Sequence, residues 1–134
     1  MKLKFLLLSS TLLLFTLATV GQTKATLYKA DQWLDIKGKG SWAKAYSNPT
    51  KEKVEVTLSI KSIKVTLGSK TLDYKLNSFY RFSDAQWRYV VSRNGGTFEI
   101  SISEHKPGTY SISIEGDEEW MITPITDVSV TEIK

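Results

Sequence analysis

The chain contains no cysteine among its 134 residues. Disulfides, thiolate metal sites and cysteine nucleophiles are therefore excluded, as is the acylation site that anchors a bacterial lipoprotein. Small secreted domains of animal origin usually depend on disulfides, so we expect a bacterial protein that is stabilised by its core alone. A usable glycosylation sequon is also absent, because Asn48-Pro49-Thr50 has proline in the forbidden position.

Apart from its first 21 residues, the chain has no long hydrophobic run. Those residues have the layout of a secretory signal peptide, with lysines at positions 2 and 4, an apolar or small-residue stretch over 5–20, and Gly21 at a cleavage point. A transmembrane helix needs about 20 apolar residues, and this stretch is shorter. We therefore predict a cleaved signal peptide at 1–21, one mature domain at 22–134 without a transmembrane span, and export to a bacterial periplasm or the extracellular space.

Groups that carry out chemistry are scarce as well. His105 is the only histidine, and it lies in a predicted hairpin turn at 104–108, where an exposed side chain is poorly positioned for a Ser-His-Asp arrangement. The densest acidic cluster, Asp117-Glu118-Glu119, lacks calcium-loop spacing and continues into a strand, where adjacent side chains point to opposite faces. Phosphate-binding, dinucleotide-binding and zinc motifs are absent. We therefore predict that the protein is not an enzyme and carries no metal and no cofactor.

Charge is divided unevenly along the chain. Residues 22–80 carry 11 lysines against 5 acidic residues, whereas residues 81–134 carry 5 basic and 9 acidic residues. In an antiparallel sheet this division favours charge pairing across neighbouring strands. The alternative is a basic face for an acidic partner, formed by Lys51, Lys53, Lys61 and Lys64.

Strand signals dominate the mature chain. Residues 54–60 alternate apolar and polar side chains without error, as a half-buried strand does. Ile63, Val65 and Leu67 continue the alternation with the opposite parity, which predicts a tight turn or a β-bulge at 61–62. Further alternating runs follow, and the turns between them are expected at 68–69, 94–96, 105–108 and 116–117.

The part before residue 52 has weaker signals. Residues 24–29 and 32–36 are predicted as short strands, with one helical turn at 30–34 as the alternative, and residues 42–46 are predicted as another strand between two loops. Near the other end, Pro124 is expected to end a strand or to place it at an edge. A total of about eight to ten short strands predicts an all-β fold, an antiparallel meander that forms a small barrel or sandwich.

Aromatic residues are abundant, with four tryptophans and six tyrosines, and several of them gather at 79–93. Exposed Trp and Tyr rings stack on sugars or other rings. The alternative is that they fill the core, with Trp87 and Tyr89 facing inward and Arg88 facing outward. The candidate ligand-binding residues are Trp42, Trp87, Tyr89 and Trp120.

Gly40-Ser41-Trp42 spells Gly-x-Trp, which resembles the first-strand motif of lipocalin-type barrels. The resemblance implies that Trp42 plugs the closed end of a barrel and that a ligand enters the opposite mouth. More broadly, the cysteine-free chain, rich in Ser, Thr and Lys, resembles small exported β proteins of Gram-negative bacteria. That second resemblance implies no particular activity.

Two functions remain open from the sequence. The first is non-enzymatic binding of a small apolar or glycan ligand among Trp and Tyr side chains. The second is a protein–protein interaction module of the cell envelope, an accessory subunit or an enzyme inhibitor, that uses a surface patch or an edge strand. Nucleic acid is not an expected partner, because the compartment is wrong and the aromatic half of the chain is net acidic. The sequence leaves the oligomeric state open.

Overall fold

The computed structural model describes residues 23–115 and 119–133. The predicted signal peptide at 1–21, the turn at 116–117 and most of the acidic cluster at 117–119 lie outside the described residues. In chain order the elements are β1 (Thr23–Ala30), β2 (Leu34–Asp35), α2 (Ile36–Lys39), α3 (Trp42–Ser47), β3 (Val54–Leu58), β4 (Ser62–Leu67), β5 (Lys70–Ser83), β6 (Gln86–Arg93), β7 (Gly96–Lys106), β8 (Thr109–Glu115), β9 (Trp120–Ile125) and β10 (Asp127–Ile133). Neither of these helices is long and apolar enough to cross a membrane.

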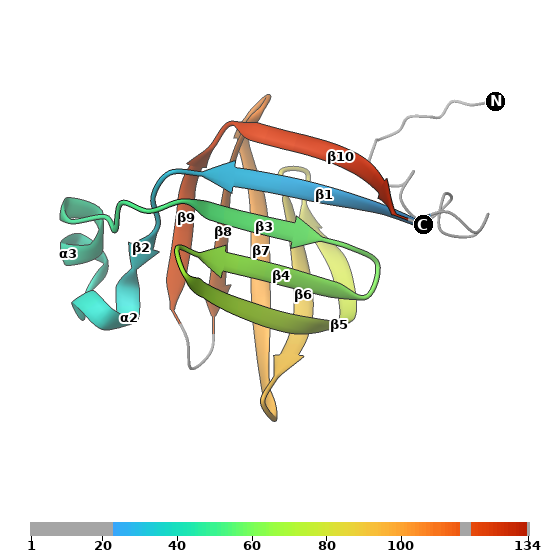
Figure 1. The fold of residues 1–134 in the computed structure, drawn as a ribbon, viewed down its shortest axis with the longest axis horizontal. Helices are drawn as coiled ribbons and strands as arrows, with labels where there is room; N and C mark the ends of the chain where they lie inside the picture. Colours follow the sequence, from blue (N-terminus) through green and yellow to red (C-terminus); the bar gives the residue numbers. More distant parts are fainter. Residues whose placement is uncertain (1–22, 116–118, 134) are drawn as a thin grey trace.

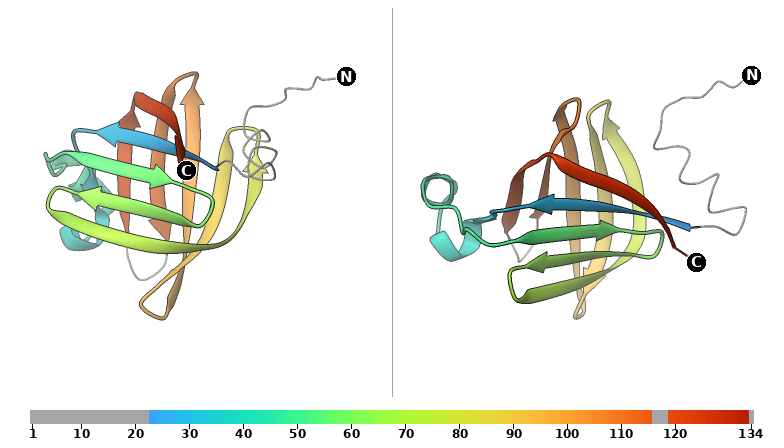
Figure 2. Two further views of the ribbon diagram at one scale, coloured as in Figure 1. Left: turned by 45° about the vertical axis from the view of Figure 1, so that its right-hand side comes forward. Right: turned by 45° about the horizontal axis from the view of Figure 1, so that its top comes forward.

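The strands form one antiparallel sheet in the order β10-β1-β3-β4-β5-β6-β7-β8-β9-β2. The all-β prediction is confirmed, and the choice between barrel and sandwich is resolved in favour of a single strongly curled sheet, a half-barrel. Figures 1 and 2 show that β10, β1, β3 and β4 form one wall, which crosses the wall of β6–β9 at a steep angle. The two walls face each other, so the concave side of the sheet encloses the core.

The long strand β5 forms the corner between the two walls. It pairs with β4 from Lys70 to Lys75 and with β6 from Lys75 onward. The pairing with β6 shifts by one residue between Leu76 and Ser78, which is a β-bulge. Because side chains alternate along a strand, one extra residue moves the following side chains to the other face. Phe79 therefore joins the concave side, as Leu76 does before the bulge.

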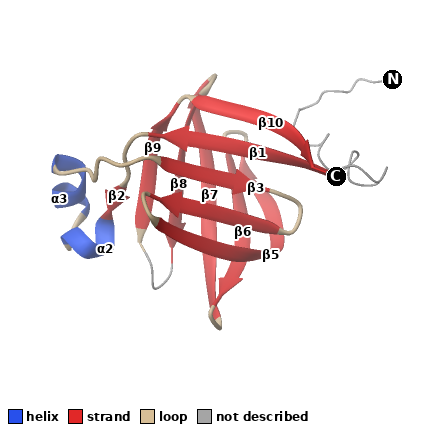
Figure 3. Ribbon diagram, viewed as in Figure 1, coloured by secondary structure: helices blue, strands red, loops and turns tan. Residues whose placement is uncertain are grey.

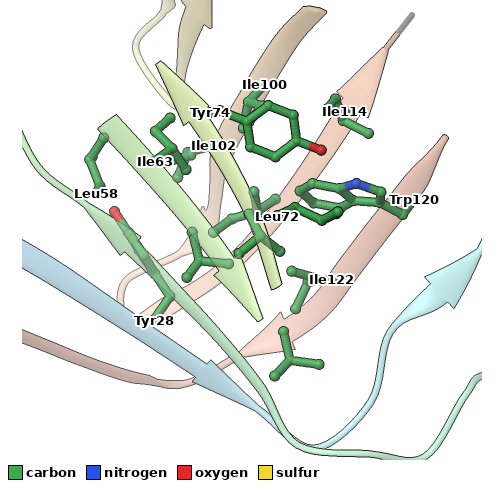
Figure 4. Close-up of a cluster of buried hydrophobic side chains, with 14 of the residues drawn as sticks. Tyr28, Leu58, Ile63, Leu72, Tyr74, Ile100, Ile102, Ile114, Trp120 and Ile122 are labelled. Atoms are coloured by element: carbon green, nitrogen blue, oxygen red, sulfur yellow. The ribbon is translucent and has the colours of Figure 1, made fainter. Parts of the chain in front are cut away.

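The core follows from the alternation in the strands. In β3 and β4 the apolar residues of each strand are buried and the polar residues between them are not. The change of parity at 61–62 is the β3–β4 turn, in which the Ser59 N–H donates to the Ser62 carbonyl over 2.9 Å. Figure 4 shows the centre of this core, where side chains from both walls meet around Tyr74 and Leu72.

The glycine turns are confirmed where the sequence predicts them. Asn94 and Gly95 have φ values of 53° and 82°, in the left-handed region that a tight hairpin needs. Gly68, with φ of 64°, turns β4 into β5 in the same way. His105, in contrast, lies on β7, and the turn that follows this strand is Pro107-Gly108.

The prediction of a strand at 42–46 is wrong, because this segment is the helix α3. Gly40 ends α2 in the left-handed conformation with φ of 83°, and the Ser41 hydroxyl then accepts the Lys44 N–H and starts α3. Ala45 is the buried residue of α3, packed in a small cluster with Leu34 and Ile36. Figure 3 shows the two short helices at one end of the half-barrel.

The predictions for the other weak regions are confirmed in part. Residues 24–29 lie in β1, whereas the strand predicted at 32–36 is confined to residues 34–35 of β2, because Ile36 begins α2. The helical turn proposed for 30–34 is absent. Pro124 lies inside β9, and the ladder between β8 and β9 is irregular at this point. Because β2 pairs only with Trp120 and Met121, the Pro124 part of β9 lies at an edge.

Candidate ligand-binding site

A pocket of about 370 Å³ lies on the concave side of the half-barrel. Its walls come from β1 and β10 on one side and from β6, β7 and β8 on the other. Leu58 at the end of β3 lines it, as do residues at the start of β6 and β8. Leu58 ends β3, and the helices precede the start of that strand, so the pocket lies at the end of this wall that is far from the helices.

The aromatic part of the lining consists of Tyr28, Trp87, Tyr89 and Tyr110. On β6, side chains pass from core to pocket: Val91 is fully buried, Tyr89 is 8% exposed and Trp87 is half-buried. Trp87 and Tyr89 therefore face inward as expected, and they both pack and line a cavity. The inward orientation is thus confirmed, while a role of these two side chains in ligand binding stays a prediction.

Phe79 packs against the rings of both Trp87 and Tyr89. Its ring centroid lies 5.9 Å from that of Tyr89 and 6.1 Å from that of Trp87. The β-bulge in β5 is responsible, because without it Phe79 would point to the outer face. Aromatic rings at this spacing stabilise the fold by more than the burial of their surface alone would. Their contacts therefore restrict the movement of Trp87 and Tyr89 in the pocket wall.

Three tyrosine hydroxyl groups gather in the pocket. The rings of Tyr28 and Tyr110 pack edge to face with centroids 5.7 Å apart. Burial raises the pKa of Tyr89 to about 12, and burial raises the pKa of Tyr28 further, with Tyr89, Tyr110 and Glu104 adding to the effect. The pKa of Tyr110 is also raised, first by burial and then by a hydrogen bond to Glu104. These hydroxyls are therefore neutral at physiological pH.

Three charged side chains line the pocket as well: Arg81, Asp84 and Glu104. The Arg81 guanidinium donates to the carbonyls of Ser83 and Asp84 over 3.3 and 3.2 Å, and it lies 3.8 Å from the Asp84 carboxylate. Glu104 accepts the Gly108 N–H at 3.4 Å and shares a hydrogen bond with Tyr110. Arg81 is thus held by its own turn, whereas Glu104 has only uncharged partners.

The structure divides the four residues singled out from the sequence. Trp87 and Tyr89 lie together in the pocket. Trp42 is 49% exposed on α3, where its ring stacks on Tyr46 with centroids 6.0 Å apart, so the expectation that Trp42 plugs the end of a barrel is wrong. Trp120 is 4% exposed in the core, and its indole N–H finds no hydrogen-bond acceptor among the residues that the structure describes.

Sequence reasoning missed Tyr28 and Tyr110. Both lie at alternating inward positions of their strands, which is the signal that marks a core residue. They are 82 positions apart, as their numbers in the sequence show. Tyr28 lies on β1 and Tyr110 on β8, which belong to opposite walls of the sheet. The two residues therefore meet only because the sheet curls and its walls face each other.

His105 has a partner that the sequence did not suggest. Its Nε2 lies 2.7 Å from the Ser111 hydroxyl, and Ser111 is 4% exposed. Within the described part of the chain, His105 has no carboxylate partner, so this pair lacks the group that orients the histidine of a catalytic triad. Between 23 and 115 and between 119 and 133, the structure contains no group of three or more His, Asp or Glu side chains able to hold a metal ion.

On the outer face, the register places some lysines opposite carboxylates of neighbouring strands. Lys29 lies opposite both Glu55 and Asp127, and Lys64 lies opposite Asp73. Opposite charges at these positions favour charge pairing over a uniformly basic face, although two ion pairs of the described residues, Arg81–Asp84 and Arg88–Glu99, involve arginines.

A separate network covers the outer face of β5–β7. Arg88 faces outward as expected, and its guanidinium lies 3.5 Å from the ring centroid of Phe82. Arg88 also forms an ion pair of 3.3 Å with Glu99, which accepts the Tyr80 hydroxyl at 3.0 Å. These groups satisfy one another, so the concave pocket is the better candidate site.

Comparisons with known proteins give no match: no family model, no curated protein and no solved structure is significantly similar to the chain.

Proposed function

We propose that the protein is an exported, non-enzymatic binding protein that holds a small ligand in the concave pocket. The observation that carries the proposal is a cavity of about 370 Å³ with aromatic walls at the mouth of the half-barrel. Small-molecule sites are concave, mostly apolar and typically about 300–1,000 Å³ in volume, with a few polar groups that fix the ligand. The pocket has each of these properties.

The lining favours a ligand with an apolar body and one or more polar groups. Leu58, Ile102 and Val128 supply apolar walls, and Trp87 supplies a half-buried ring for stacking. Neutral tyrosine hydroxyls both donate and accept hydrogen bonds. A flat ring with a polar substituent, or a sugar that stacks on Trp87, fits this combination.

An uncharged fluorescent dye, N-phenyl-1-naphthylamine, tests the proposal. The folded protein should enhance the dye's fluorescence, and an apolar competitor should displace it. Trp87→Ala should weaken binding by about fivefold or more, because losing a stacked aromatic typically costs about 1–3 kcal/mol. Trp42→Ala is the matched control, since Trp42 lies on α3 outside the pocket, and it should leave binding unchanged. Absence of binding by the native protein would eliminate the proposal.

Export is part of the same proposal and has its own support in residues 1–21. Mass spectrometry of the protein recovered from its host's envelope or medium should give a chain that begins at Gln22. An intact Met1 would refute export but would not affect the proposal that the pocket binds a ligand.

A second candidate, an interaction module, is favoured by one specific observation. Trp42 and Tyr46 form an exposed stacked pair on α3, and exposed aromatic pairs are typical of protein contacts. The double variant Trp42→Ala, Tyr46→Ala should then lose an envelope partner in a pull-down while it still binds the dye. Charge reversal of Lys51, Lys53, Lys61 and Lys64 tests the basic-face version, and unchanged recovery of the partner would refute that version.

A further inference from the structure

We propose that the pocket selects organic cations, ligands with a quaternary or tertiary ammonium group on an apolar body. The inference rests on the proposed ligand-binding function and names the ligand class of that site. It follows from two features of the lining that occur together: a carboxylate without a cationic partner and a group of electron-rich aromatic rings.

The carboxylate is Glu104. Among the described residues, its partners are the Tyr110 hydroxyl and the Gly108 N–H, and no lysine, arginine or histidine lies within ion-pair distance of it. The other two charges of the lining offset each other, because Arg81 is held beside Asp84 by hydrogen bonds within its own turn. The charges that line the pocket therefore sum to one negative charge.

The aromatic rings complete the case for a cation. Tyr28, Trp87, Tyr89 and Tyr110 come from three strands and converge on one cavity of about 370 Å³. The face of an aromatic ring carries partial negative charge, so several rings together attract a cation that has lost its hydration shell. A quaternary ammonium group donates no hydrogen bonds, so such rings can surround it without leaving an unsatisfied donor.

The same arrangement disfavours an anion. A carboxylate or sulfonate in the pocket would meet Glu104 and the aromatic rings of the lining. The Arg81 guanidinium would attract an anion, but the Asp84 carboxylate, 3.8 Å away, offsets its charge. Glu104 is solvent-exposed and has no cationic partner among the described residues, so its charge repels an anion, whereas the apolar walls favour cationic, neutral and anionic ligands of the same shape equally. Selectivity thus depends on charge, while Leu58, Ile102 and Val128 contribute affinity.

Three probes of nearly equal shape test the inference on the full chain: choline, its uncharged carbon analogue 3,3-dimethylbutan-1-ol, and the anion 3,3-dimethylbutanoate. Dissociation constants come from ligand-observed NMR titrations. Choline should bind at least about tenfold more tightly than the alcohol, because only choline carries a charge that the Glu104 carboxylate and the aromatic rings attract. The anion should bind weakest.

Glu104→Gln removes the charge and keeps the shape and most of the hydrogen bonding of the side chain. We expect it to weaken choline binding about tenfold and to leave the alcohol's affinity unchanged. Glu55→Gln is the matched control, because it removes the same charge from the exposed outer face of β3, and it should leave choline binding unchanged. Thermal unfolding of both variants verifies that they are folded.

The outcomes separate the two proposals. Equal binding of choline and the alcohol, unaffected by Glu104→Gln, would overturn cation selectivity and leave the binding pocket in place. Tighter binding of the anion would overturn selectivity in the same way. If none of the three probes binds and the dye N-phenyl-1-naphthylamine does not bind either, the proposed function itself is refuted.

Discussion

Alkaline pH should destabilise the fold through the tyrosines of the pocket. Burial holds the pKa of Tyr89 at about 12 in the folded chain, against 10.0 for an exposed phenol. Between these values the unfolded chain has lost the Tyr89 proton while the folded chain keeps it. The contribution of the protonated Tyr89 to the free energy of unfolding is therefore fully present below pH 10. It is lost as the pH rises toward the pKa of Tyr89 in the folded chain.

The size of the effect follows from the shift. One ionising group changes the free energy of unfolding by about 1.4 kcal/mol per pH unit in this window. Over the interval from 10.0 to about 12, Tyr89 alone accounts for about 2.7 kcal/mol. Tyr28, whose pKa burial raises even further, adds a similar slope over the same interval.

Urea denaturation at a series of pH values measures this loss. The free energy of unfolding of the unmodified protein should fall more steeply above pH 10 than that of Tyr89→Phe, by about 1.4 kcal/mol per unit. All other groups are the same in both proteins, so their effect cancels in the comparison. Tyr46→Phe, which removes an exposed phenol from α3, is the control and should leave the slope unchanged. Identical slopes for the unmodified protein and Tyr89→Phe would refute the buried position of this phenol.

Two further substitutions test the fold that shapes the pocket. Ile112→Ala empties a fully buried core position and should lower the free energy of unfolding by about 2–5 kcal/mol, whereas Ile60→Ala, at a half-exposed position, should change it by less than about 0.5 kcal/mol. Equal effects in chemical denaturation would contradict the assignment of inward and outward faces. Gly95→Ala should lower the free energy of unfolding by about 1–2 kcal/mol, because φ is 82° at this position. A Cβ there would meet nothing within 4 Å, so the loss comes from backbone conformation alone. Gly95→Asn should cost less because Asn tolerates this region, and a neutral Gly95→Ala would argue against the turn.

The strands and turns could be predicted because each leaves a local signal. Alternation along 54–58 is a direct consequence of one buried face, whereas Ile60, which continues the pattern in the sequence, lies beyond the end of β3 and is half-exposed. The parity change at 61–62 required a turn before the chain could continue. Asn94 and Gly95 adopt positive φ values readily, so the hairpin between β6 and β7 was predictable from two residues. Sheet curvature leaves no such signal, since a barrel and a sandwich share the same alternation.

The helix at 42–46 was missed for a physical reason. α3 has six residues and one buried side chain, Ala45, so it shows almost no amphipathic period. The signals that were present are the Gly40 and Ser41 caps, together with the spacing of four between Trp42 and Tyr46. Those residues were interpreted as a strand motif, and a short aromatic segment between loops is compatible with either element.

The pocket was only half predictable. Trp87 and Tyr89 were identified because they alternate on one strand, but Tyr28 and Tyr110 come from strands that meet only after the sheet has curled. The β-bulge after Leu76 decides that Phe79 faces inward, and no residue near it distinguishes that bulge from a regular strand. A site formed by strand order and a bulge therefore requires the three-dimensional structure.

The four tryptophans permit one direct test of the central claim that the concave pocket binds the ligand. Trp87 lies in the pocket, Trp42 on α3, Trp120 in the core, and the indole N–H of Trp33 donates to Glu52 over 2.8 Å. The measurement is an NMR titration of the four indole N–H signals with N-phenyl-1-naphthylamine, assigned with Trp→Phe variants. We predict that the Trp87 signal shifts with the dye while the other three stay in place. A shift of Trp42 with Trp87 unmoved, or no shift at all, would contradict the account.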